Sequence, residues 1–137
     1  MDDGQSFAKK EYPPLLWQVE ALPEFARTLK QYQKKHRDAV AQLLVNLEAM
    51  HEALNLGVKP ASLQSGHIHH EPQGILAVDQ RGGPGKTIEL RLYTYPCEGS
   101  STLHLLMIGD KGSQSRDIAW CSGVVRNLRK ERADGQA

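Results

Sequence analysis

The sequence predicts a single domain of the α+β class, and three observations lead to this prediction. Apolar residues recur at helical spacing between residues 23 and 54 and again from residue 113. Short runs rich in β-favouring residues lie at 15–22, 75–80, 88–95 and 102–108. The later runs are joined by short connections, so their simplest arrangement is an antiparallel sheet of three or four strands.

The N-terminal part predicts a leader, a strand and the start of a helix. Residues 1–14 are polar and end in two prolines, so we expect a flexible leader before the domain at 15–132. The run Leu15–Leu22 predicts the first strand. Pro23 suits the first helical turn, and the acidic Glu24 is well placed for the positive end of the helix dipole.

Two helices with a tight turn between them follow. The basic segment Lys34–Asp38 interrupts the apolar pattern and predicts the turn, with Asp38 as the N-cap of the second helix. Gly57 is the expected C-cap, and Pro60 follows it. The apolar stripe of the second helix predicts core packing against a sheet, and consists of Val40, Leu43, Leu44, Leu47, Met50 and Leu54.

The C-terminal half predicts a β-hairpin followed by a helix. The runs Ile88–Tyr95 and Thr102–Ile108 have strand length and flank a turn-rich connection at 96–101. A helix with basic residues toward its end is expected from Ser113, and residues 133–137 are expected to form a tail.

Length and composition exclude several classes of protein. The chain of 137 residues is long enough to bury a core, and it has no apolar run near the roughly 18 residues of a membrane span. The acidic first residues do not resemble a secretory signal, and two cysteines are too few for a disulfide framework. We therefore expect a cytoplasmic protein without a membrane partner.

Positive charge is concentrated near the C-terminus. The formal net charge is only +1, which argues against a strongly basic nucleic-acid binder. Residues 111–132 nevertheless hold six Lys or Arg against two Asp or Glu. This basic segment predicts either a solvated helix face or an anion-binding surface, with Arg126, Arg129 and Lys130 as candidate RNA contacts.

The glycine-rich segment Gly82–Thr87 resembles a phosphate-binding loop only superficially. A Walker loop needs glycine five positions before Gly85, where this chain has Gln80. It also needs a helix after the Lys-Thr pair, but the pattern there predicts a strand. We therefore expect no nucleotide site and no small-molecule cofactor.

A histidine cluster lies between the second helix and the predicted sheet. On a strand, His67 and His69 share one face and His70 takes the other. These residues are open to three interpretations: metal ligation, general acid–base catalysis together with Glu71, or ordinary surface histidines. No CxxC or HExxH spacing supports a metal site, so no metal is expected.

Three cations flank the predicted β-hairpin. Arg91 lies in its first strand, Lys111 follows its second, and Arg116 opens the last helix. If they converge, they suit an anion such as a phosphodiester, with Tyr93 or Tyr95 stacking on a base. The competing interpretation is that Arg91 forms an ion pair with a nearby carboxylate, Glu89 or Asp110.

The chain as a whole resembles a known family. The order of its segments is similar to the RelE/ParE superfamily of toxin–antitoxin toxins, closest to its HigB-like, phage-related branch. The matching segments are Trp17–Val19 with Pro23–Phe25, the helical hairpin, Gly74–Val78, Leu90–Tyr93 and Leu105–Ile118.

The resemblance implies a toxin that cleaves mRNA on the ribosome and is silenced by a cognate antitoxin. In that scheme Arg91 contacts the scissile phosphate, Lys111 supplies the basic residue after the last strand, and Arg116 adds charge. A residue of the segment 67–71, with His67 and His69 as the first candidates, would act as acid or base. The alternative within the same fold is a binding module without catalysis, either a gyrase-directed ParE-like toxin or an inactive relative.

Overall fold

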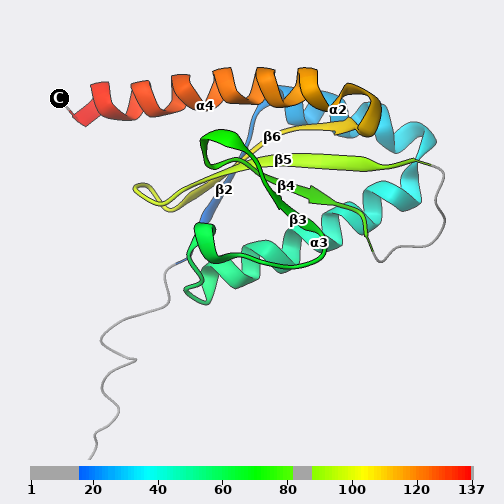
Figure 1. Cartoon of the computed structure of the whole chain (residues 1–137), viewed down its shortest axis with the longest axis horizontal. Coiled ribbons are helices and arrows are strands. Elements are labelled where there is room, and N and C mark those ends of the chain that lie inside the picture. The colour runs from blue at the N-terminus through cyan, green and yellow to red at the C-terminus, as the bar shows by residue number, and fades with distance from the viewer. Residues whose placement is uncertain (1–15, 82–87, 137) are drawn as a thin grey trace, which may run out of the picture.

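The computed structural model describes residues 16–81 and 88–136 and confirms the α+β class (Figure 1). The expected leader 1–14 and the glycine-rich segment 82–87 lie outside the described residues. The regular elements in chain order are β2 (Gln18–Ala21), α2 (Pro23–Lys35), α3 (Arg37–Asn55), η1 (Pro60–Ser62), β3 (Ile68–His70), η2 (Pro72–Gly74), β4 (Leu76–Asp79), β5 (Leu90–Cys97), β6 (Thr102–Asp110), η3 (Lys111–Ser113) and α4 (Gln114–Gln136).

Five strands form one mixed sheet in the order β2-β6-β5-β4-β3. The four strands β3 to β6 pair in antiparallel fashion, as the short connections predict. The first strand, β2, lies beside β6 and runs parallel to it. This parallel pair is possible because the α2–α3 hairpin and three strands separate β2 from β6 along the chain.

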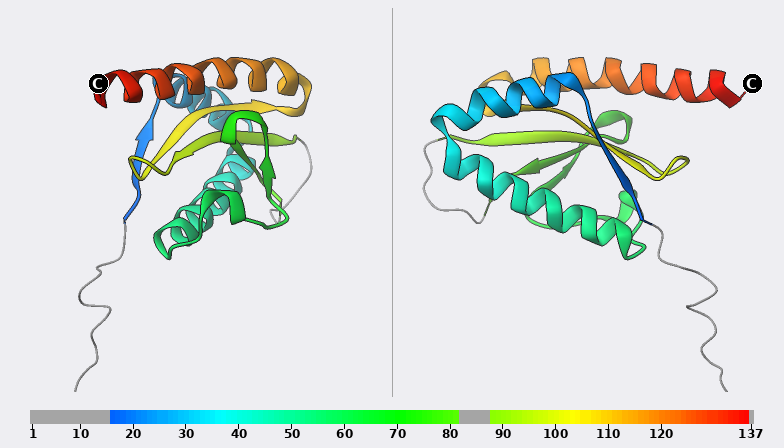
Figure 2. Two further views of the ribbon diagram at one scale, coloured as in Figure 1. Left: turned by 60° about the vertical axis from the view of Figure 1, so that its left-hand side comes forward. Right: turned by 180° about the vertical axis from the view of Figure 1, so that it is seen from behind.

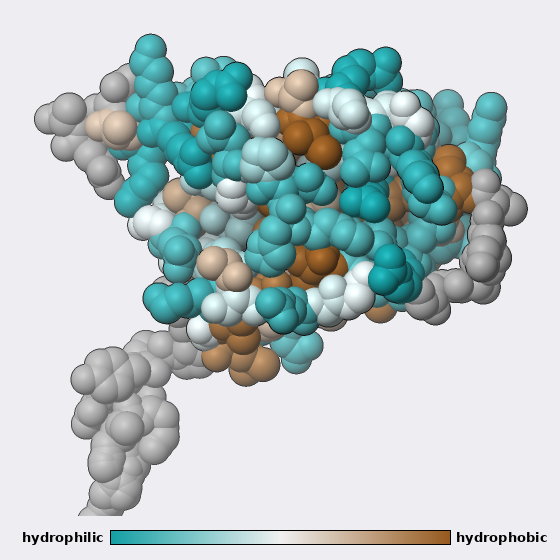
Figure 3. Space-filling view, viewed as in Figure 1, coloured by the Kyte–Doolittle hydropathy of each residue, from teal (hydrophilic) through white to brown (hydrophobic). Residues whose placement is uncertain are grey.

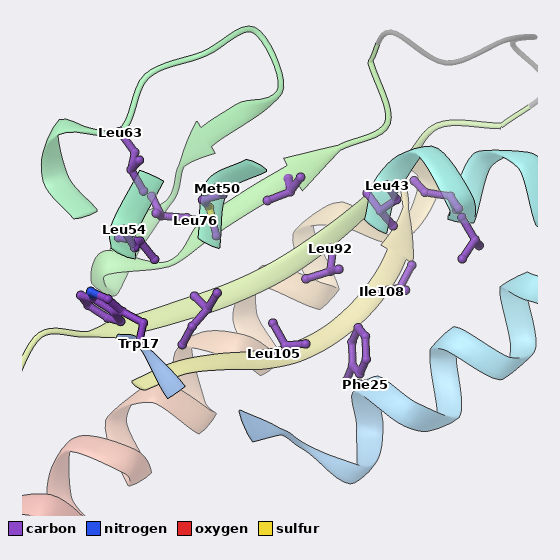
Figure 4. Packing of buried hydrophobic residues seen from close by; sticks show 14 of the residues in the cluster. Trp17, Phe25, Leu43, Met50, Leu54, Leu63, Leu76, Leu92, Leu105 and Ile108 are labelled. Atoms are coloured by element: carbon purple, nitrogen blue, oxygen red, sulfur yellow. The ribbon is translucent and has the colours of Figure 1, made fainter. Parts of the chain in front are cut away.

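Helices cover both faces of the sheet (Figures 1 and 2). The α2–α3 hairpin packs on one face and α4 crosses the other, which we call the α4 face. The larger core lies between the sheet and the hairpin. Figure 4 shows Phe25 of α2 and Leu43 of α3 in this core with Leu92 and Ile108 of the central strands, all at most 7% exposed.

A smaller core lies between the sheet and α4. Tyr93 and Leu106 from the sheet pack there against Cys121 and Val125 of α4, and all four side chains are fully buried. Successive residues of a strand point to opposite faces, so alternate residues of β5 serve the two cores.

Helix α2 completes the outer edge of β6. Strand β2 covers this edge only from Thr102 to Leu105. Beyond that point the Ile108 backbone N–H donates to the hydroxyl oxygen of Thr28, at 2.9 Å, and that hydroxyl donates to the Glu24 carbonyl. One side chain thus satisfies a buried backbone donor that no strand reaches.

Several predicted boundaries differ from those observed. The first strand is shorter than Leu15–Leu22, because the Trp17 N–H donates to the Asn55 side chain and Pro23 already starts α2. Asp38 is not the N-cap that we expected, since α3 starts at Arg37. Asp38 lies instead in the first helical turn, where its charge still suits the helix dipole.

Several elements in the second half of the chain have different bounds from those predicted. Strand β5 runs from Leu90 to Cys97, two residues later than the predicted 88–95, and β6 continues to Asp110. Helix α4 runs to Gln136, so residues 133–136 of the expected tail are helical. The C-cap of α3 is Leu56 rather than the expected Gly57, which follows it with φ 102°, a conformation that suits a glycine just past a helix end. No helix in the described part of the chain is long and apolar enough to cross a membrane.

Candidate active site on the α4 face of the sheet

Arg91 is the centre of a half-buried polar group on the α4 face. It follows Leu90 and precedes Leu92, both of which point into the larger core, so its own side chain takes the opposite face. Its guanidinium Nη1 lies 3.8 Å from Oε2 of Glu71, which directly follows β3. The two side chains are 20% and 15% exposed, respectively. Neither carboxylate of the competing interpretation, Glu89 or Asp110, is the observed partner.

His69 is held by a carboxylate in the same area. Its Nε2 lies 2.7 Å from Oδ2 of Asp79, and the carboxylate can only accept, so Nε2 carries the proton. Burial raises the pKa of Asp79, but hydrogen bonds from His69 and from the Arg81 backbone together hold that pKa below its ordinary value. Asp79 is also the register partner of Arg91, which places the His69–Asp79 pair next to the arginine.

A buried hydroxyl lies beneath this group. Tyr93 is fully buried on the α4 face, and its hydroxyl has no hydrogen-bond partner within the described ranges. Burial and the negative charge of Asp117 raise the pKa of Tyr93. Such burial contradicts the expected base-stacking role of Tyr93, because its ring is covered.

Asp117 is the acid nearest to the start of α4. Its Oδ2 accepts a hydrogen bond from the Ser113 hydroxyl at 2.6 Å, and its side chain is packed over Gly109. Burial raises the pKa of Asp117, and the hydrogen bond from Ser113 and the charge of Arg116 offset only part of this increase. The glycine is required here because a β-carbon at position 109 would collide with this carboxylate.

The three predicted cations do not converge. Lys111 is exposed, and its Nζ lies 3.8 Å from Oε1 of Glu89. Arg116 lines a separate hollow of about 280 Å³ between α2 and α4, together with Tyr32 and Trp120. The side chain of Arg91 reaches toward Glu71, at the opposite end of β4 from these residues. The sequence could not reveal this, because strand position does not fix the direction of a long side chain.

Arg129, expected to bind RNA, is engaged within the protein. Its guanidinium donates to the side chain and backbone oxygens of Gln73, at 2.6 and 2.8 Å, and lies 5.5 Å from the Tyr95 ring centre. Tyr95 is only 8% exposed and stacks on His104, so it offers little free ring surface to a base. Arg129 thereby fixes η2, the turn that carries the chain from Glu71 to β4.

The remaining predicted residues lie at the surface. Arg126 and Lys130 are exposed on α4. His67 precedes β3, and its carbonyl accepts the Asp79 backbone N–H. His70 points to the other face, as alternation predicts, and its Nε2 lies 2.7 Å from the Leu63 carbonyl oxygen.

The described residues contain no group of three or more His, Cys, Asp or Glu side chains that could hold a metal ion. The histidines instead have separate partners: His69 bonds to Asp79, and His70 to a backbone carbonyl.

Sequence reasoning missed two partnerships in the site. Glu71 belongs to the predicted acid–base segment 67–71 but was not expected to pair with Arg91, and Asp79 was not among the candidate residues. Period-two alternation offered a signal for the first, because His69 and Glu71 are two positions apart and therefore share a face. The pairing of His69 with Asp79 needed the register of β3 against β4, which the sequence did not specify.

The arrangement combines a cation, a carboxylate in a long ion pair with that cation, and an oriented imidazole. Arg91 can bind a phosphate oxygen, since its contact with Glu71 at 3.8 Å is too long for a hydrogen bond and is easily exchanged. Glu71 can accept a proton, and His69 can hold one at Nδ1 while Asp79 fixes its Nε2. These are the groups that transesterification of a phosphodiester requires.

Comparison with known proteins found no match, whether to family models, to curated proteins or to solved structures.

Proposed function

We propose that the chain is an endoribonuclease of the toxin–antitoxin type that cleaves mRNA. The single observation that carries the proposal is the grouping of Arg91, Glu71 and His69 on one half-buried surface. The mRNA substrate on the ribosome, a cognate antitoxin and a cytoplasmic location are part of the proposal and rest on the RelE/ParE resemblance.

The proposed reaction needs no metal. Glu71 accepts the proton of the 2′-hydroxyl, whose oxygen then attacks the adjacent phosphorus. Arg91 leaves Glu71 and donates hydrogen bonds to the phosphate oxygens as negative charge builds up on them. Protonated His69 gives its Nδ1 proton to the leaving 5′-oxygen, and Asp79 stabilises the imidazolium during this step.

Charge compensation in the site also suits control by an antitoxin. The carboxylate of Glu71 offsets the charge of Arg91 in the free protein, so RNA must displace Glu71 from Arg91 to bind. An acidic segment of a partner can occupy Arg91 in the same way and exclude the phosphate.

The test is cleavage of RNA by purified protein with and without ribosomes. We expect Arg91→Ala to lower the cleavage rate by about 10²–10³, the usual effect of removing one transition-state donor. The control Lys30→Ala removes an exposed cation from α2, outside the candidate site, and should cleave normally. Equal cleavage by wild type and Arg91→Ala would overturn the proposal.

A second candidate is a binding module without catalysis, and one observation favours it. Val19 on β2 and Val45 on α3 are 47% and 55% exposed, and they line an apolar groove of about 370 Å³ with Leu44 and Leu103. A protein partner, such as gyrase for a ParE-like toxin, would dock on this hairpin side. Val45→Asp would then abolish growth inhibition, whereas Arg91→Ala would leave it intact.

A further inference from the structure

A separate cavity lies at the end of the sheet where β5 turns into β6, and His70 and Leu76 line it from the hairpin side of the sheet. Helix α4 extends past the turn between β5 and β6 (Figure 1). The cavity, of about 880 Å³, is lined by residues of both. The surface around this end of α4 is predominantly hydrophilic (Figure 3). Tyr95, Cys97 and His104 line it from the sheet, and Arg129 and Arg132 line it from α4. Arg91, Glu71 and His69 are not among the lining residues.

Cys97 is placed in this cavity by the end of β5. Its side chain is partly exposed, and it points to the α4 face like Tyr95, two residues earlier. Burial raises the pKa of its thiol, but hydrogen bonds from Ser100 and Gly99 and the charge of Arg132 together bring that pKa below its ordinary value. The guanidinium of Arg132 lies directly over Gly99, where a β-carbon would have no room.

The imidazole of His104 also belongs to the cavity wall. His104 is only 9% exposed, and its buried Nδ1 makes no hydrogen bond within the described part of the chain. The nearest acid, Glu20, is 3.6 Å away, beyond hydrogen-bonding distance. Burial lowers the pKa of His104, so the ring is neutral at neutral pH. A neutral ring can accept a hydrogen bond from a bound molecule or donate one to it.

The lining carries both signs of charge. Arg129 and Arg132 face the cavity from α4 together with Glu131, while Glu20 and Glu98 line it from the sheet side. A volume of this size is in the range of roughly 300–1,000 Å³ that small-molecule pockets occupy. A zwitterionic molecule of tripeptide size fits this volume and mixed charge better than a simple anion does.

We propose that Cys97 is a reactive thiolate that forms mixed disulfides with small zwitterionic disulfides entering this cavity. The Cys97 sulfur attacks one sulfur of the disulfide, a new S–S bond forms, and the other half leaves as a thiolate that takes a proton from water. The exchange involves no net oxidation or reduction, so it needs no further oxidant. Arg132 and the backbone of the β5–β6 turn stabilise the attacking thiolate.

The chain contains its own control thiol. Cys121 is fully buried in the smaller core, and burial raises its pKa to about 12. It therefore reports any loss of structure, because it reacts only when α4 leaves the sheet.

The experiment is incubation of the folded chain with oxidised glutathione at neutral pH, followed by intact mass measurement and peptide mapping. We expect one glutathione per chain on Cys97, none on Cys121, and none at all in Cys97→Ser. The rate with each disulfide is divided by the rate of the same disulfide with the urea-unfolded chain, which corrects for its intrinsic reactivity. After this correction, oxidised glutathione should react several times faster than uncharged hydroxyethyl disulfide.

Two variants test the role of Arg132 without removing the thiol. Arg132→Gln and Gly99→Ala, which displaces the guanidinium, should each slow the reaction several-fold. Arg126→Gln, an exposed arginine of the same helix outside the cavity, should not slow it. Equal reactivity of Cys97 and Cys121, no preference for glutathione, or an unchanged rate in both Arg132 and Gly99 variants would overturn the proposal. The experiment uses no RNA, so its result is independent of the proposed ribonuclease activity.

Discussion

The guanidinium of Arg91 on β5 lies 3.8 Å from the carboxylate of Glu71, which directly follows β3, a strand that is not a neighbour of β5 in the sheet. Strand β4 lies between them, and it carries only the small Ala77 on this face between their positions. A long side chain can therefore cross β4 to meet Glu71. Arg91 can therefore bind phosphate, form a structural ion pair with Glu71, or form the ion pair in the free protein and bind phosphate when RNA is present.

Replacing Glu71 by Gln separates these roles. The substitution keeps the size of the side chain and removes its charge, so we expect RNA binding to be kept or strengthened while cleavage falls by about 10²–10⁴. Binding is measured by fluorescence anisotropy with a 2′-deoxy substrate analogue, and cleavage with the matching RNA. Glu131→Gln, an exposed acid on α4, is the control. Full cleavage by Glu71→Gln would remove Glu71 from the mechanism.

The edge of β6 depends on one hydroxyl. Thr28→Val keeps the shape of the side chain but leaves the Ile108 N–H without an acceptor, so we expect a loss of about 1–3 kcal/mol in the free energy of unfolding. Thr28→Ser keeps the oxygen and should lose less. Urea unfolding of both variants checks this, and equal stabilities would show that the hydrogen bond contributes nothing measurable.

Two glycines near α4 should respond in opposite directions. Gly109→Ala forces a β-carbon against the Asp117 carboxylate, and we expect destabilisation of about 1–3 kcal/mol from this overpacking. Gly123 lies inside α4, where an added β-carbon would come no closer than 3.8 Å to its nearest neighbour, the flexible Arg126 side chain. Helix propensity then predicts a gain of up to about 1 kcal/mol for Gly123→Ala. Thermal unfolding of both variants measures the two effects.

The buried His104 predicts a specific pH dependence of stability. Its folded-state pKa is below the unfolded value of 6.5, so its neutral form stabilises the folded state above pH 6.5. As the pH falls below 6.5, the unfolded chain takes up a proton that the folded chain resists, and this contribution is lost. Wild type should therefore lose more stability than His104→Gln between pH 7.5 and 5.5, in urea titrations. Equal losses of stability in wild type and His104→Gln would mean that folding does not lower the pKa of His104.

The fold class and the local elements were accessible from the sequence, whereas their partners were not. Helical spacing placed α2, α3 and α4, and β-favouring runs placed β4, β5 and β6. Strand β2 pairs in parallel with β6 although more than 80 residues separate the paired positions in the sequence, and no local pattern contains that information. The same reason explains why Thr28, an ordinary polar residue on a helix, gave no sign of its bond to β6.

Part of the candidate site was predictable. The choice of Arg91 and His69 came from residue type and position, and alternation puts His69 on the same face as Glu71. The face of Arg91 follows from the packing of Leu90 and Leu92 in the larger core. The expected meeting of Arg91 with Lys111 was wrong, because the arginine side chain extends along the sheet away from that lysine. The cavity at Cys97 was hidden, since it arises where the far end of α4 overhangs a turn that is distant in sequence.

The central claim is that Arg91 serves RNA cleavage, and induction of the protein in growing cells tests it most directly. Wild type, Arg91→Ala and Lys30→Ala are compared for growth, and mRNA 5′ ends are mapped after induction. The account predicts growth arrest with new mRNA ends in wild type and Lys30→Ala, and neither effect in Arg91→Ala at equal protein level. Arrest without new ends, or new ends that persist in Arg91→Ala, would contradict it.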